Sequence, residues 1–86
     1  MQKKKSGICE AFGLAVKLRR EELRLTQESL AGLAQINRTY LSDIERDSWN
    51  PPLVNIDRLA KALSCSLSGL FKSAEVFTEH ESNKKR

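Results

Sequence analysis

Apolar residues recur at helical spacing along most of the chain and are separated by short polar breaks. Phe12, Val16 and Leu23 fall on one stripe of a predicted first helix over residues 8–24. The same spacing predicts helices over 27–34, 38–46 and 53–63, and a short fifth helix over about 67–72, after which the chain is expected to fray. No segment shows the alternation of a strand, so the predicted fold class is all-α, a compact bundle of five short helices. The fourth helix is expected to bury Leu53, Ile56, Leu59, Ala60 and Leu63.

The second and third predicted helices are joined by one sharp turn. Thr26 is placed to cap the second helix, with Leu25 and Leu30 as a hydrophobic staple across the cap. Asn37 repeats this arrangement for the third helix, so residues 34–37 leave room only for a tight turn. In such a unit the first helix supports the second, which can enter the major groove of DNA. The pattern therefore favours a sequence-specific DNA-binding protein.

Four segments occur in order over about 60 residues: REELRLTQESLA at 20–31, NRTYLSDIER at 37–46, NPPL at 50–53 and LAKALSCSLSGLF at 59–71. Together they resemble the Cro/phage-repressor (XRE-like) helix-turn-helix family, and within it the controller proteins of restriction–modification systems. The resemblance implies a lambda-repressor-like fold and a transcriptional regulator that binds a near-palindromic operator as a homodimer. The chain departs from the family at Gln35 and Asp47, where Gly is usual and a left-handed backbone is often needed.

The third helix carries the residues expected to read DNA bases. With Leu41 and Ile44 in the core, helical spacing places the polar residues on the opposite side, and those expected to contact bases are Arg38, Thr39, Ser42 and Asp43. Arg38 suits a bidentate contact with guanine, with a phosphate contact or a solvated charge as the alternative. Thr39 suits a thymine methyl or a hydrogen bond. Asp43 either accepts from cytosine, orients Arg38 or Thr39, or excludes unfavourable sequences by repulsion.

Phosphate contacts are expected from Gln27, Asn37, Tyr40 and Arg46. Gln27 stands at the start of the second helix, where free backbone amides and the helix dipole favour an anion, and the resemblance gives this position a phosphate-clamping role. For Tyr40 the alternative is a half-buried ring that packs on the second helix, which still allows its hydroxyl to reach DNA.

Two further features of the domain concern structure. The resemblance implies that Arg20 and Glu45 form a largely buried ion pair between the first helix and the end of the third. Trp49 is either a lid over the fourth helix or an exposed ring beside the DNA backbone.

Dimerisation is expected to use the C-terminal part of the chain, because a small domain gains little affinity from one half-site. The fifth helix carries more apolar residues than its own core needs, and the resemblance places the dimer around the fourth and fifth helices. The expected interface residues are Leu67, Leu70, Phe71, Val76 and Phe77. The alternative is that they only cover the core of the monomer.

The length of 86 residues predicts one small domain over 8–73, with a disordered basic arm at 1–7 and a partly helical or disordered tail at 74–86. The net charge is +4, yet six of the 15 basic residues lie in 1–5 and 84–86, which leaves nine against 11 acidic residues. DNA affinity must therefore come from where the charges sit and from the tails.

Other classes of protein receive little support. No segment resembles a membrane span or a signal peptide, so a cytoplasmic location is expected. Cys9 and Cys65 are far apart and His80 falls in the tail, so we expect reduced thiols, no metal, no cofactor, no small-molecule ligand and no enzyme activity. The alternative function is an antitoxin-type module that binds DNA and a partner protein.

Overall fold

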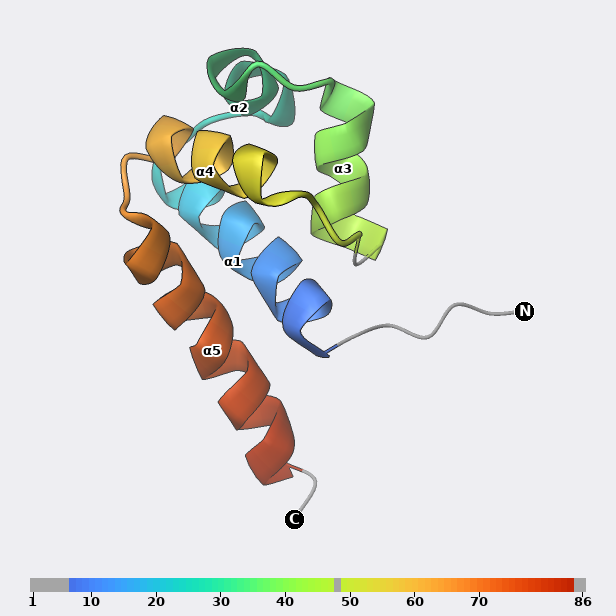
Figure 1. Ribbon diagram of the computed structural model, residues 1–86, viewed down its shortest axis with the longest axis vertical. Coiled ribbons are helices and arrows are strands. Elements are labelled where there is room, and N and C mark those ends of the chain that lie inside the picture. Colours follow the sequence, from blue (N-terminus) through green and yellow to red (C-terminus); the bar gives the residue numbers. More distant parts are fainter. Residues whose placement is uncertain (1–6, 48, 85–86) are drawn as a thin grey trace, which may run out of the picture.

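The computed structural model describes the backbone of residues 7–47 and 49–84, and the side chains of 7–46 and 49–78. The described residues form five helices and no strand, which confirms the predicted all-α class (Figure 1). The helices are α1 Gly7–Glu22, α2 Gln27–Ala34, α3 Arg38–Asp47, α4 Leu53–Ala62 and α5 Leu67–Lys84. The basic arm predicted at 1–7 lies outside the described residues, except that Gly7 begins α1.

Helix α1 lies between two partners, α3 on one side and α5 on the other, while α2 packs on α3 and α4. The largest fully buried side chains come from all five helices: Val16, Leu30, Leu41, Ile44, Leu59, Leu63 and Leu70. Phe12 and Phe71 join α1 to α5, with ring centroids 6.1 Å apart. One shared core therefore positions the helix-turn-helix unit, α2 and α3, against α1 and α4 (Figure 1).

The turn between α2 and α3 forms as the capping residues predict. Oγ1 of Thr26 accepts from the backbone N–H of Ser29 at 3.0 Å, which caps α2. Gln35 adopts the left-handed conformation with φ 60°, although it is not glycine, and its backbone N–H bonds to the carbonyl of Gly32 at 3.2 Å. This bond and the one from the N–H of Ile36 to the carbonyl of Ala31 at 3.0 Å satisfy two of the last carbonyls of α2 and turn the chain directly into α3.

Gly13 allows a close approach between the backbones of α1 and α3. A Cβ atom built at this position would lie 2.2 Å from the carbonyl oxygen of Ile44. No side chain fits there, so the backbone of the two helices must touch at this point. The sequence pattern did not predict this contact, because a glycine in a helix has no apolar side chain to mark its face.

Helix α5 corrects the prediction of a short fifth helix that frays after Lys72. It continues to Lys84 and runs along α1, so that Thr78 lies beside Gly7 at the start of α1 (Figure 1). Ala74 is fully buried, and the domain therefore extends beyond its expected end at residue 73. The reason is that Ala74 and Phe77 pack against the core that α5 shares with α1.

One burial prediction in α4 was wrong, and one of the two alternatives for the loop residue Trp49 is excluded. Leu53 was expected in the core but is 69% exposed, because it is the first residue of α4 and lies at the edge of the bundle. Trp49 is 52% exposed and so is not a lid over α4.

Candidate DNA-binding surface

Helix α3 has one buried and one accessible side. Leu41 and Ile44 are completely buried in the core. The four residues expected to read bases lie together on the other side; Arg38 and Thr39 are exposed, and Ser42 and Asp43 are half-buried. The accessible side therefore begins at the N-terminal turn of α3, the part that meets base edges in this kind of unit.

The two arginines of α3 differ in their surroundings. Arg38 makes no hydrogen bond or ion pair with any other described residue. Arg46, whose side chain is 63% exposed, bonds to Oδ1 of Asp43 at 3.1 Å and to Oγ of Ser42 at 3.3 Å. In the isolated protein Asp43 thus pairs with Arg46 and does not orient Arg38.

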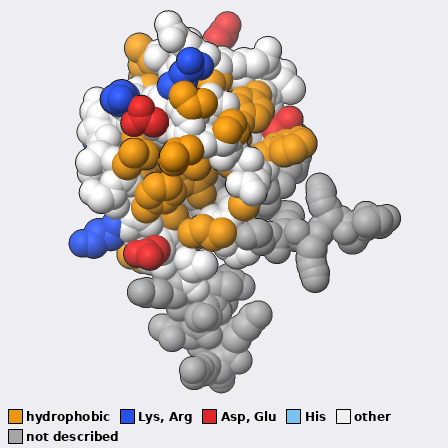
Figure 2. Space-filling view, viewed as in Figure 1, with side chains coloured by type: hydrophobic (Ala, Val, Ile, Leu, Met, Phe, Trp, Pro, Cys, Tyr) orange, Lys and Arg blue, Asp and Glu red, His pale blue; other side chains and the backbone are white. Residues whose placement is uncertain are grey.

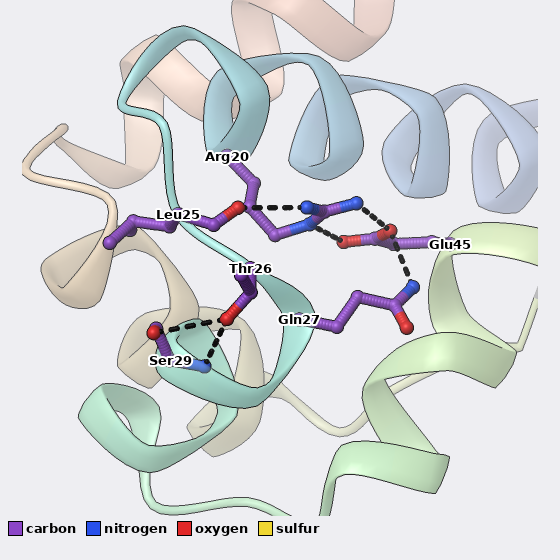
Figure 3. A network of polar contacts seen from close by, with 6 residues as sticks. All are labelled: Arg20, Leu25, Thr26, Gln27, Ser29 and Glu45. Atoms are coloured by element: carbon purple, nitrogen blue, oxygen red, sulfur yellow. Dashed lines mark hydrogen bonds and ion pairs between the residues drawn. The ribbon is translucent and has the colours of Figure 1, made fainter.

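A polar network anchors the C-terminal half of α3 (Figure 3). The structure brings Arg20 and Glu45 together, with Nε to Oε2 at 2.8 Å and Nη2 to Oε1 at 3.0 Å. Nη1 of Arg20 also donates to the carbonyl of Leu25 at 2.9 Å. The two side chains are only 11% and 3% exposed, so water competes little for these bonds. The hydrogen bond that Arg20 donates to Glu45 raises the pKa of Arg20, and desolvation by burial opposes this rise.

Gln27 joins the same network from the start of α2. Its Nε2 donates to Oε1 of Glu45 at 3.0 Å, so one carboxylate holds residues from α1 and α2. Sequence reasoning assigned Gln27 to phosphate alone and missed this contact. The tilt of α3 is therefore fixed by both preceding helices.

Three of the residues predicted to contact phosphate have internal hydrogen bonds that determine which of their groups face outward. Oδ1 of Asn37 accepts from two backbone N–H groups in the first turn of α3, at 2.7 and 3.3 Å. The hydroxyl of Tyr40, whose ring packs half-buried against the core, accepts from Nδ2 of Asn55 at 3.2 Å. Gln27 gives one amide hydrogen to the ion pair. Phosphate oxygens only accept, and the remaining amide and hydroxyl hydrogens are the donors that suit them.

The apolar residues expected at a dimer interface have different environments. Leu70 is 2% exposed and belongs to the core of the monomer, which corrects its expected place at an interface. Leu67, Phe71 and Phe77 are partly buried against that core, and Val76 is 56% exposed. Figure 2 shows hydrophobic side chains gathered over α1, α4 and α5 on one face. The exposed Leu53 at the start of α4 adds an apolar group that sequence reasoning had placed inside.

The cysteines lie apart from the accessible side of α3. Cys9 and Cys65 are both free thiols and half-buried. Burial raises the pKa of the Cys65 thiol, while the nearby Arg19 opposes this rise. Among the described residues no cluster of His, Cys, Asp and Glu is arranged to hold a metal ion. Within that same part of the chain, no helix has the length and apolar character needed to cross a membrane.

Comparison with known proteins identifies the family. The model of the helix-turn-helix family matches residues 16–70, which include α2, α3 and α4 completely. The chain belongs to this helix-turn-helix family. This helix-turn-helix protein is 38% identical over 69 residues to the immunity repressor protein of Bacillus phage phi105. It is 42% identical over 59 residues to the control protein C.MunI of a Mycoplasma species.

The extent of these matches differs between the two relatives. The first covers 80% of this chain but 48% of the phage repressor, so the chain spans about half the length of that relative. The second covers 69% of this chain and 80% of C.MunI. The similarity to the control protein therefore reaches over most of both chains.

Solved structures give the same result. The restriction-modification controller protein C.AhdI from Aeromonas hydrophila is 35% identical, with a TM-score of 0.72 over 76% of this chain and 98% of its own. A variant of C.Esp1396I bound to its highest affinity operator site is 28% identical, with a TM-score of 0.80 over 86% of this chain and 97% of its own. This helix-turn-helix protein is thus a DNA-binding regulator of the XRE type.

Proposed function

We propose that this protein binds a near-palindromic operator as a homodimer and regulates transcription in the manner of a restriction–modification controller protein. The observation that carries the proposal is the placement of α3. Its N-terminal turn exposes Arg38 and Thr39, while Glu45 in its last turns is fixed to α1 and α2. The similarity to the control protein C.MunI, to the controller protein C.AhdI and to operator-bound C.Esp1396I supports this function.

In this proposal Arg38 grips a guanine through N7 and O6, because its guanidinium is exposed and has no partner among the described residues. Thr39 contacts a thymine methyl or a neighbouring base edge, and Ser42 donates or accepts one turn further along. Asp43 holds Arg46 through Oδ1 in the isolated protein, and its second carboxylate oxygen can accept from cytosine.

The DNA phosphates are held by residues at the start of α2, at both ends of α3 and in its first turn. Gln27 and Asn37 present amide hydrogens, Tyr40 presents its hydroxyl, and Arg46 presents a charge. The exposed Arg38 and these donors lie on α3 or at the adjacent start of α2. One strand of the backbone can therefore be clamped while α3 enters the groove.

The second copy of the chain is proposed to pack on α4 and α5. Leu53 and Val76 supply exposed apolar groups, and Leu67, Phe71 and Phe77 supply partly exposed ones. A two-fold axis through this surface would repeat each contact and present two α3 helices to the same side of DNA.

The direct test is selection of binding sites from a random DNA pool, followed by sedimentation of the complex. We expect an enriched near-palindrome with half-site centres about one helical turn, or roughly 10 base pairs, apart, and two protein chains per site. Enrichment of a single unrepeated half-site, or of no sequence, would contradict the proposed function.

A further inference from the structure

The Tyr40 hydroxyl is held by a residue of α4 that the helix-turn-helix unit does not contain. Nδ2 of Asn55 lies 3.2 Å from Oη of Tyr40, and the contact is partly buried. Asn55 stands in the first turn of α4, which begins after the extended Pro52. Both the tyrosine ring and Ile56 beside Asn55 pack against the core, so neither end of this hydrogen bond is on a loose segment.

The direction of this hydrogen bond matters for DNA. A tyrosine hydroxyl has one hydrogen to donate and can accept at its oxygen. Here the amide donates and the hydroxyl oxygen accepts, so the hydroxyl hydrogen is given to no other residue in the described part of the chain. A phosphate oxygen has no hydrogen to give, and it can bond to Tyr40 only through that hydroxyl hydrogen.

We propose that Asn55 is a positioning residue that keeps the Tyr40 hydroxyl as a donor toward a DNA phosphate. This inference rests on the proposed DNA contact of Tyr40. The amide of Asn55 fixes the rotation of the Tyr40 hydroxyl. Because this amide nitrogen is a donor, it occupies the place where an acceptor inside the protein would take the hydroxyl hydrogen. An acidic side chain at the same place would reverse the bond, because a carboxylate can only accept.

The test compares Asn55→Asp with Asn55→Ala and Tyr40→Phe, using a duplex selected by the wild-type protein. Tyr40→Phe and Asn55→Asp should each weaken binding by about tenfold, the range for a lost hydrogen bond to a charged group. Asn55→Ala should weaken it less, since the hydroxyl can still rotate its hydrogen toward DNA. Asn55→Ala in the Tyr40→Phe background should have no further effect, because Asn55 acts only through the hydroxyl.

A matched control variant separates the loss of binding caused by the reversed hydrogen bond from the loss caused by the added negative charge. Val54→Asp places the same charge in the same helical turn, and Val54 is exposed and makes no described hydrogen bond. The loss caused by the added charge alone shrinks as salt rises, so Val54→Asp, measured at two salt concentrations, gives the size of that share. Asn55→Asp should weaken binding more than Val54→Asp in the wild type, and equally in the Tyr40→Phe background.

Two outcomes would overturn the inference. Additive effects of Asn55→Ala and Tyr40→Phe would mean that Asn55 touches DNA by itself. Equal losses of DNA binding for Asn55→Asp and Val54→Asp in the wild type would mean that the added charge alone explains the weaker binding of Asn55→Asp. If the wild type selects no sequence at all, the proposed function fails instead. Thermal melts of each variant show whether a lost fold accounts for a loss of binding.

Discussion

The side chains of Arg20 and Glu45 are almost fully buried, and their ion pair holds α3 in place. Removing either side chain should therefore destabilise the fold. Arg20→Ala should cost roughly 3 kcal/mol or more of unfolding free energy, because Glu45 would stay buried without its partner. Glu45→Ala should cost a similar amount, and the double variant should cost less than the sum of the two. Urea melts give these values.

The chain offers a control pair of opposite exposure. Lys61 and Asp57 on α4 are 2.8 Å apart, yet the lysine side chain is 75% exposed. Lys61→Ala should change stability by no more than about 0.5 kcal/mol. Small additive effects at Arg20 and Glu45, no larger than that at Lys61, would show that the buried pair does not form.

The base-reading role of Arg38 gives the second prediction. Arg38→Ala should lose about 1 to 3 kcal/mol of binding free energy per half-site and relax the preference at one symmetric base position. Site selection with the variant measures both effects. Arg58→Ala removes an equal charge from α4, outside the helix-turn-helix unit, and should return the wild-type motif. If Arg38→Ala also returns that motif, Arg38 contacts phosphate.

At the residue scale, hydrogen bonds between near neighbours in the sequence could be predicted. Contacts between residues far apart in the sequence, and the burial of single leucines, could not. Thr26 and Asn37 could be recognised as caps because the groups they bond lie two or three residues away. The bond from Gln27 to Glu45 joins residues 18 apart in the sequence, and only the crossing of α2 and α3 brings them together. Leu53 and Leu70 look alike as leucines on apolar stripes, although one is exposed and the other is buried.

At the scale of elements, the contact of α1 with α3 depends on a missing side chain. Gly13→Ala should destabilise the fold by about 1 to 3 kcal/mol, because its Cβ would meet the carbonyl oxygen of Ile44 and both are parts of rigid helices. The same substitution should shift α3 and reduce DNA affinity beyond the loss of folded protein. Denaturant melts and binding measured on the folded fraction separate the two effects.

Gly32 provides the matched substitution in a helix. It lies in α2, and a Cβ built there has no neighbour within 4 Å. Gly32→Ala should stabilise the protein by up to about 1 kcal/mol, since alanine favours a helix over glycine. Equal stabilisation by Gly13→Ala would rule out the close contact between α1 and α3.

The length of α5 could not be judged from local signals. After Lys72 the apolar positions thin out, which suggested fraying, although neither Gly nor Pro follows Gly69 to stop a helix. What sustains the helix is burial of Ala74 and packing of Phe77 against the core. Tertiary packing of this kind supplies most of the stability of helices in proteins.

At the scale of the whole molecule, two exposed leucines test which surface forms the proposed dimer: Leu53 lies on that surface, and Leu33 lies on α2, outside it. Leu53→Asp should give a folded monomer with weak operator binding, because Leu53 is exposed on the proposed dimer surface. Leu33→Asp alters a leucine on α2 that is 62% exposed, and this variant should remain a dimer. Sedimentation at micromolar concentration checks both. A wild type that is monomeric there, or a dimeric Leu53→Asp, would contradict the proposed interface.

The separation of the two sides of α3 also has a consequence for how the protein can diversify. The core contacts of Leu41, Ile44 and Tyr40 and the ion pair of Glu45 hold this helix, whereas the side chains of Arg38 and Thr39 bond to no other described residue. Substitutions at these two positions can therefore leave the stability of the fold unchanged. Relatives can bind new target sequences by changing this one small set of side chains. A library randomised at residues 38 and 39 should yield folded proteins throughout, each with its own preferred site.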